Sequence, residues 1–319
     1  MSVEMTAEPA TPKLATAGDY VQLLKPRIMM LVVFTALAGL VAAVGVTGQE
    51  INLVLATVAI LSVALGSGAA GAINMWYDAD IDAIMTRTST RPIPSGAVPK
   101  DEALTMGLIM SAVSVLLMWI ASNVLAAGLL ALSIAYYGWF YTMVLKRRTA
   151  QNIVIGGAAG AFPPVIGWAA VTGTTPLDAW ILFAIIFFWT PPHFWALSLV
   201  AHKEYAKAGV PMLPVTNGAK ATRNQILIYT LILAPIGLAP LLTGLGGWVY
   251  GAVGVALTLG FIYFAAKVWR SEAGEADAGD AERKLAMGMF AFSIFYLFGL
   301  FAALIIERGF GLYFPLGGL

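Results

Sequence analysis

The sequence contains no cysteine, and it has only two histidines among its 319 residues. The lack of cysteine excludes disulfides and thiolate chemistry within this chain. Two histidines also leave no material for a zinc site built on His and Cys ligands. Charged residues make up 11% of the chain, against about 25% in soluble domains, so a water-soluble globule is excluded. The net charge of +1 provides no basic surface, and we expect no nucleic-acid partner.

What the chain has in abundance is long apolar sequence, with 60% hydrophobic residues. A helix needs about 20 consecutive apolar residues to cross a bilayer. Runs of that length occur at 28–47, 51–73, 103–122, 124–144, 152–172, 177–200, 225–243, 248–266 and 286–306. The sequence therefore predicts an all-α membrane protein with nine transmembrane helices and the lipid bilayer as its environment.

The first 24 residues differ from the remainder in composition. They are polar, and they include two Glu and one Asp. An organelle transit peptide is rich in Arg and poor in acids, and a signal peptide begins with a basic and then an apolar stretch. Neither pattern fits, so we expect residues 1–24 to be a flexible cytoplasmic tail. Residues 25–319 should form a single transmembrane domain.

Basic residues are distributed unequally between the two sides of the predicted bundle. Seventeen of the 18 Lys and Arg residues fall before the first run or in alternate connections, and the remaining one, Arg308, follows the ninth run. Connections rich in Lys and Arg face the cytoplasm in multi-pass membrane proteins. The amino terminus should therefore lie inside, and the carboxyl terminus outside.

The connection after the second run is acidic as well as basic. Asn74, Asp78 and Asp82 follow each other at intervals of four, which places them on one face if the helix continues, while Asp80 points the opposite way. Carboxylates stacked in this way repel one another. Mg²⁺ removes that repulsion, and it binds proteins through one or two carboxylates together with substrate phosphates. The spacing favours a Mg²⁺ site over the alternative of a solvated helix end.

Two arginines, Arg87 and Arg91, follow this acidic face within ten residues. A guanidinium group can hold two phosphate oxygens at once. Pro92, Pro94 and Gly96 then predict a rigid turn that brings the chain back over the site. The simpler alternative is that these arginines serve only the cytoplasmic bias of basic residues.

A second charged cluster, at residues 202–218, follows the sixth run and again precedes a proline-spaced turn ending in Gly. Its position four helices after the first cluster suggests an internal repeat. Two half-sites would then face each other across a central cavity that opens to the cytoplasmic side.

These stretches resemble a known family. N-x-x-x-D-x-x-x-D followed by R-T-x-x-R-P-I-P-S-G (74–96) is similar to the first Asp-rich motif of the UbiA-type intramembrane prenyltransferases. The stretches 145–173, 189–198 and 202–215 resemble more narrowly the haem-farnesylating branch of that family. The similarity extends from about Lys25 to the end of the ninth run, and the family has nine helices.

The resemblance implies a reaction with farnesyl diphosphate and haem b as substrates. Farnesyl would be transferred to a vinyl group of haem b, and water would add, giving haem O and diphosphate for haem-copper oxidase biogenesis. Mg²⁺ would be held by Asn74, Asp78 and Asp82. The implied location is a bacterial cytoplasmic membrane with the active site facing the cytoplasm, and a haem A synthase or an oxidase assembly factor is a candidate partner. The residues implied in catalysis are Asp78, Asp82, Arg87 and Arg91, and those implied in diphosphate binding are Arg87, Arg91, Lys146, Arg147 and Lys203.

The chain departs from other branches at the second motif. Relatives that prenylate aromatic acids or quinone precursors have a second Asp-rich motif there, whereas this chain has Lys203, Glu204 and Tyr205. A single carboxylate makes a second metal ion doubtful. Lys203 is expected to contact diphosphate directly, with Glu204 as its alternative partner.

The resemblance and the membrane setting together direct attention to both histidines. His193 follows Pro191 and Pro192 within the sixth run, and prolines free backbone carbonyls that membrane helices tolerate beside a cavity. An ionisable residue at that depth is a functional candidate. We expect His193 and Trp189 to contact the porphyrin, with His202 as a candidate nearer the surface. Whether His193 binds iron or a propionate stays open at this stage.

Two other functions fit part of the sequence. One is a prenyltransferase that acts on a quinone or chlorophyll precursor, which the single carboxylate at residues 202–205 disfavours. The other is a secondary transporter, since broken helices and polar groups at the midplane also mark transporters. The acids of this chain cluster at the cytoplasmic edge instead.

Overall fold

A computed structural model describes residues 15–315, and within them nine helices are long and apolar enough to cross a membrane. The prediction of an all-α protein with nine spans is confirmed, because each predicted run lies, apart from at most two terminal residues, in one of these helices. They are α2 (Pro26–Thr47), α3 (Leu53–Tyr77), α5 (Lys100–Ala121), α6 (Val124–Ala135) continued by the π-helix η1 (Tyr136–Leu145), α7 (Asn152–Thr172), α8 (Leu177–Lys207), α10 (Ala219–Leu238) with α11 (Pro240–Thr243), α12 (Trp248–Arg270) and α13 (Asp280–Gly309).

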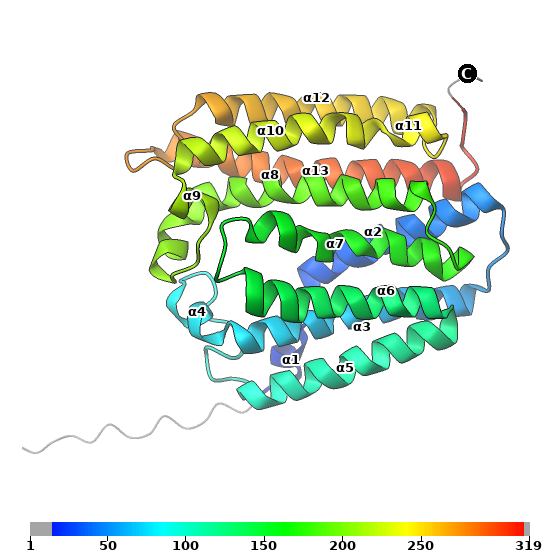
Figure 1. Ribbon diagram of the computed structural model, residues 1–319, viewed down its shortest axis with the longest axis horizontal. Coiled ribbons are helices and arrows are strands. Elements are labelled where there is room, and N and C mark those ends of the chain that lie inside the picture. Colours follow the sequence, from blue (N-terminus) through cyan, green and yellow to red (C-terminus); the bar gives the residue numbers. More distant parts are fainter. Residues whose placement is uncertain (1–14, 316–319) are drawn as a thin grey trace, which may run out of the picture.

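Three short helices complete the described fold: α1 (Ala17–Leu23), α4 (Ala79–Ile84) and α9 (Leu213–Thr216). Figure 1 shows the long helices side by side in one bundle, with α4 and α9 at the same end. The carboxyl-terminal end of α13 lies at the opposite end of the bundle. The two charged connections of the sequence are therefore neighbours in space.

Helices α7 and α8 are the two most buried of the nine. Each contains a proline pair, Pro163–Pro164 in α7 and Pro191–Pro192 in α8, and neither pair interrupts its helix. Neighbouring helices surround both pairs, and a membrane helix tolerates proline where protein covers the freed carbonyls. Because α7 and α8 lie at the centre, both helices should border a cavity inside the bundle.

Helices α2 and α7 contact each other through their backbones. A Cβ atom at Gly39 would lie 2.0 Å from the Pro164 carbonyl oxygen, and one at Gly167 would lie 2.0 Å from that of Ala36. Small residues permit such close helix contacts in membranes, where dispersion forces replace the hydrophobic effect as the driving force. This contact fixes the middle of α2 against α7 at the centre of the bundle.

The amino-terminal segment differs from its expected form. Helix α1 lies within the stretch expected to be a flexible tail, and Thr16 and Asp19 close a capping box at its start. Leu23 is fully buried in a cluster with Ala72, Met75 and Val98. Burial of Leu23 fixes this helix against α3, so the expectation of flexibility is wrong for the described part. Residues 1–14 lie outside the described residues.

Candidate active site

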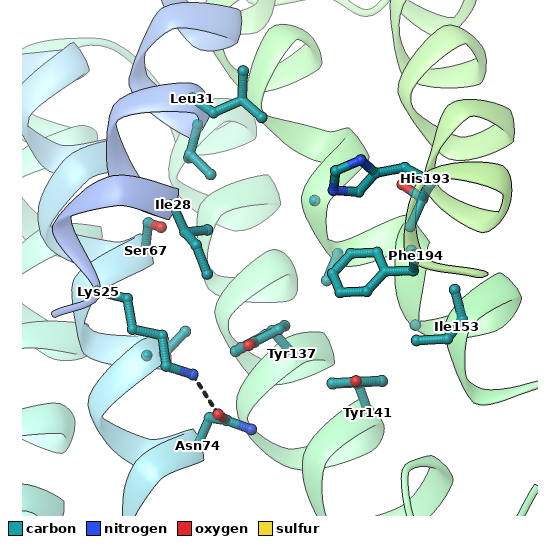
Figure 2. Close-up of a pocket in the computed structure, with 18 of the residues that line it drawn as sticks. Lys25, Ile28, Leu31, Ser67, Asn74, Tyr137, Tyr141, Ile153, His193 and Phe194 are labelled. Atoms are coloured by element: carbon teal, nitrogen blue, oxygen red, sulfur yellow. Dashed lines mark hydrogen bonds between the residues drawn. The ribbon is translucent and has the colours of Figure 1, made fainter. Parts of the chain in front are cut away.

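A cavity of about 690 Å³ opens into the bundle at the end where α4 and α9 lie. It is bounded by residues of α2, α3, α6, η1, α7, α8 and α13. Charged and amide groups gather around Lys25 and Asn74, whereas aliphatic and aromatic side chains form most of the remaining wall (Figure 2). Its volume is within the usual range of small-molecule sites, about 300–1,000 Å³.

The predicted metal face is formed where α3 passes into α4. The backbone N–H of Asp78 donates to the Asn74 carbonyl at 2.9 Å, and that of Asp82 donates to the Asp78 carbonyl at 2.8 Å. The interval of four is therefore kept across the junction. Asn74, Asp78 and Asp82 are all buried, while the Asp80 side chain is 61% exposed. The predicted separation of Asp80 from the other three is confirmed.

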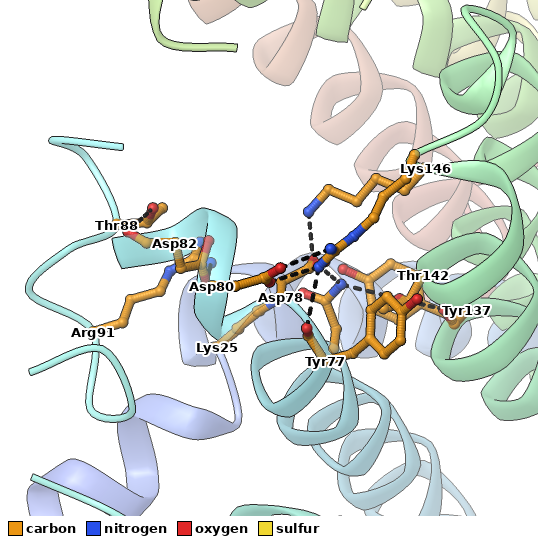
Figure 3. A network of polar contacts seen from close by, with 12 residues as sticks. Lys25, Tyr77, Asp78, Asp80, Asp82, Thr88, Arg91, Tyr137, Thr142 and Lys146 are labelled. Carbon is orange, nitrogen blue, oxygen red and sulfur yellow. Dashed lines mark hydrogen bonds and ion pairs between the residues drawn. The ribbon is translucent and has the colours of Figure 1, made fainter. Parts of the chain in front are cut away.

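Each of the three side chains on this face contacts a different cation, as Figure 2 shows for Asn74 and Figure 3 for Asp78. The Lys25 ammonium donates to the Asn74 Oδ1, and the Lys146 ammonium donates to the Asp78 Oδ2. Arg91 donates to Asp82 at 2.6 Å. These cations come from three separate segments of the chain, so the contacts connect those segments at one end of the bundle.

Asn74 has a single possible orientation in this network. Its Nδ2 donates to the Asp78 Oδ2 at 2.8 Å and to the Thr142 Oγ1 at 3.0 Å. Both donors of the amide group are thereby committed. The amide oxygen must then face the Lys25 ammonium and the cavity, which is the orientation that a metal ligand requires.

The three groups fit a Mg²⁺ ion. The Asp78 Oδ1 is buried without a hydrogen-bond partner, and the Arg147 guanidinium lies 3.6 Å from it. No group of three His, Cys, Asp or Glu side chains among residues 15–315 is arranged to hold a metal. The candidate set is instead two carboxylates and one amide oxygen, which matches the few protein ligands that Mg²⁺ takes beside substrate phosphates.

Lys25 is a functional candidate that the sequence reasoning counted only as a cytoplasmic-side charge. It has a left-handed backbone with φ 52°, which is unusual for a residue other than Gly and is expensive just before a proline. Burial, together with the nearby positive charges of Arg91 and Lys146, lowers the pKa of Lys25 to about 7. In the sequence, the one feature that could have indicated a special role for Lys25 is its position directly before Pro26, close to the start of the first apolar run.

The predicted diphosphate-binding residues divide into two groups. Arg87, Arg91 and Lys146 border the cavity. Arg87 forms no hydrogen bond or ion pair with any described residue, so its guanidinium is available to a ligand. Arg147 is not among the residues that border the cavity. Its guanidinium donates to both Asp80 oxygens, at 2.8 and 2.6 Å, and these hydrogen bonds hold the pKa of Asp80 below its usual value.

The π-helix η1 is a further feature that the sequence did not reveal. Its wide turn lets the Thr142 hydroxyl donate to the Tyr137 carbonyl at 2.7 Å, and Thr142 in turn accepts from Asn74. Tyr137 and Tyr141 stack at 5.4 Å and border the cavity. Helix segments of this type are rare and often mark functional sites. Here η1 ends directly before Lys146.

His193 and Trp189 both border the cavity, as the sequence predicted. His193 stacks between Trp189 and Phe290, with ring centroids 4.3 and 4.5 Å apart. Figure 2 shows its ring on the wall facing Ile28 and Leu31. The cavity thus has a charged end and a histidine wall.

The second charged connection, residues 202–218, brings fewer of its predicted site residues to the cavity than expected. Tyr205 borders the cavity and packs against Ile81 and Met85, so the two connections do meet. His202, Lys203 and Glu204 are not brought to the cavity. Lys203 is exposed, and His202 contacts the Leu199 carbonyl of its own helix at 2.8 Å.

The model of the UbiA prenyltransferase family matches residues 32–294. The chain belongs to the UbiA prenyltransferase family. Similar curated members include a protoheme IX farnesyltransferase of Hyphomonas neptunium, 71% identical over 315 residues and covering 99% of both chains. Another, from Methylobacterium radiotolerans, bears the same description and is 54% identical over 311 residues, with 96% of each chain covered.

Solved structures share the UbiA fold at low sequence identity. A structure of digeranylgeranylglyceryl phosphate synthase has a TM-score of 0.71 at 17% identity, covering 91% of this chain and 98% of the other. A UbiA homologue from Archaeoglobus fulgidus bound to GPP and Mg²⁺ has a TM-score of 0.65 at 19% identity, covering 90% and 99%. These likenesses establish the fold.

Lys25→Met should weaken binding of inorganic pyrophosphate to this UbiA-family protein. The substitution keeps an unbranched side chain that is one atom shorter, and it removes the charge that faces the cavity. One hydrogen bond to a charged group contributes about 1.5–3 kcal/mol, so we expect affinity to fall at least about tenfold in calorimetric titrations. Lys100→Met is the matched control, because Lys100 lies over the Trp76 ring and does not border the cavity. Equal affinities for parent and Lys25→Met would exclude an anion contact.

Proposed function

We propose that this chain transfers the farnesyl group of farnesyl diphosphate to a vinyl group of haem b, with addition of water to that group, giving haem O and diphosphate. The family membership supports prenyl transfer, and the relatives described as protoheme IX farnesyltransferases support haem as the acceptor. The observation that carries the proposal is that one and the same cavity has a cationic end and a histidine-bearing aromatic wall.

The charged end suits the departure of diphosphate. Leaving diphosphate accumulates negative charge, and cations already in position stabilise that charge as it develops. Lys25, Arg87, Arg91 and Lys146 all border the cavity. A Mg²⁺ ion held by Asn74, Asp78 and Asp82 would supply further positive charge at the same place. The UbiA homologue solved with GPP and Mg²⁺ supports this requirement.

The rest of the cavity suits the other half of the reaction. An allylic cation reacts with water unless water is excluded, and the walls beyond the charged end are mostly apolar. The stacked rings of Tyr137 and Tyr141 lie between those walls and the network around Asn74. Aromatic faces attract cations, so these rings would stabilise the farnesyl cation after diphosphate departs.

We propose a bacterial cytoplasmic membrane as the location, with the charged end facing the cytoplasm. The basic connections lie at that end, and the relatives are bacterial. Haem b and farnesyl diphosphate would enter from the cytoplasmic side or the inner leaflet. A haem A synthase or an oxidase assembly factor that receives the product stays a prediction.

The absence of cysteine provides a clean test of this orientation. Ser95→Cys lies in the connection between α4 and α5, and Gln49→Cys lies in the connection between α2 and α3; both positions are exposed. A membrane-impermeant maleimide should label only Gln49→Cys in intact spheroplasts, and both variants after lysis. Labelling of Ser95→Cys alone before lysis would reverse the proposed orientation.

Substitutions of Asp78 and Asp82 should lower Mg²⁺-dependent ligand affinity, whereas substitution of Asp80 should not. Asp78→Asn and Asp82→Asn remove a buried carboxylate with little change of shape, whereas Asp80→Asn affects an exposed pair with Arg147. The first two should lower the Mg²⁺-dependent affinity for a non-ionising farnesyl diphosphate analogue by about tenfold or more, as loss of a charged contact does. Asp80→Asn should stay close to the parent. A similar loss in all three would refute the assigned face.

The proposed reaction can be tested by mass analysis of haems extracted from cells that express this chain. We expect a haem that is heavier than haem b by one farnesyl group and one hydroxyl group. Asp78→Asn should abolish it at equal protein level. Unmodified haem together with a prenylated quinone or chlorophyll precursor would instead assign the chain to another branch of the family.

A further inference from the structure

The environment of His193 fixes which of its ring nitrogens carries the proton. The His193 Nδ1 lies 2.6 Å from the Ser293 Oγ, and the Ser293 hydroxyl donates to the Phe290 carbonyl at 2.6 Å. A serine hydroxyl has one proton to donate. If that proton went to His193 instead, the Ser293 and Phe290 oxygens would lie 2.6 Å apart with no hydrogen between them, so the proton goes to Phe290 and the Ser293 oxygen accepts from His193. The Nδ1 must therefore carry hydrogen.

The second nitrogen, Nε2, is consequently a bare lone pair in the neutral ring. It has no hydrogen-bond partner among the described residues, and it is not one of the buried polar atoms sealed off by protein. His193 itself borders the cavity. Figure 2 shows one nitrogen of the ring directed away from α8 into the open space.

The ring cannot rotate away from this direction. Trp189 and Phe290 stack on its two faces, and the Trp189 Nε1 donates to the Ser293 carbonyl at 2.7 Å. Ser293 thus holds His193 through its side chain and Trp189 through its backbone. This arrangement joins α8 to α13 and aims a single acceptor nitrogen at the cavity.

We propose that His193 Nε2 is an axial ligand of the haem iron and that Ser293 is the residue that positions it. Histidines that bind metals characteristically donate their other ring N–H to an oxygen acceptor, which fixes the tautomer. A propionate carboxylate would need a donor, and a bare Nε2 provides none. The inference rests on the proposed function, and it specifies that the acceptor must be a metallated porphyrin.

The test compares the binding of iron(III) protohaem and metal-free protoporphyrin IX to purified full-length protein. The parent should bind haem with the Soret band of nitrogen-ligated iron. His193→Phe fills the aromatic stack but has no lone pair, so it should lose this spectrum while binding metal-free porphyrin like the parent. Imidazole added to His193→Gly should restore the spectrum.

Ser293→Ala tests the positioning role. Loss of such an outer contact commonly lowers metal affinity about 10- to 100-fold, so haem affinity should fall while metal-free porphyrin affinity is unchanged. Ser293→Thr should recover haem binding. Ser198→Ala is the control, because Ser198 is a buried serine of α8 whose hydroxyl donates only within its helix, to the Trp195 carbonyl.

An unchanged Soret band in His193→Phe would overturn the proposal, as would equal losses for haem and metal-free porphyrin. If the parent forms haem O but binds haem without nitrogen ligation, only the inference fails. If the parent neither binds haem nor forms haem O, the inference and the proposed function fail together.

Discussion

The burial of two carboxylates where α3 passes into α4 is the constraint on which the site depends. Asp78 and Asp82 are almost inaccessible, and a buried charge without a partner is strongly destabilising. Their partners come from distant segments: Lys146 follows η1, and Arg91 follows α4. Lys25, bound to the adjacent Asn74, adds the chain before α2. Compensation of these charges therefore assembles three connections at one end of the bundle.

Under the proposed function, the same contacts would prepare the site for an anionic substrate. Each cation is paired with an oxygen that can also bind a metal. When metal and diphosphate bind together, the metal can replace the cation on that oxygen, and the cation can move to a phosphate oxygen. The cavity extends from this network to the histidine wall without leaving the bundle. A farnesyl diphosphate at the charged end and a porphyrin at His193 would consequently share one enclosed space.

The fold and the placement of Asn74, Asp78 and Asp82 on one face were largely predictable from the sequence, because both depend on simple periodicity. Apolar run length identified nine helices, and the interval of four separated Asp80 from Asn74, Asp78 and Asp82. The roles of Lys25, Arg147 and Ser293 depend on contacts between distant segments, which no local pattern records. The π-helix η1 escaped prediction for a similar reason, since its apolar composition is that of an ordinary α-helix.

A structure of the protein with Mg²⁺ and a non-ionising farnesyl diphosphate analogue would test the exchange of partners most directly. The account predicts a metal bound by Asn74, Asp78 and Asp82, with Lys25, Arg91 and Lys146 moved onto phosphate oxygens. An analogue bound at the charged end with all three original pairs intact would contradict it.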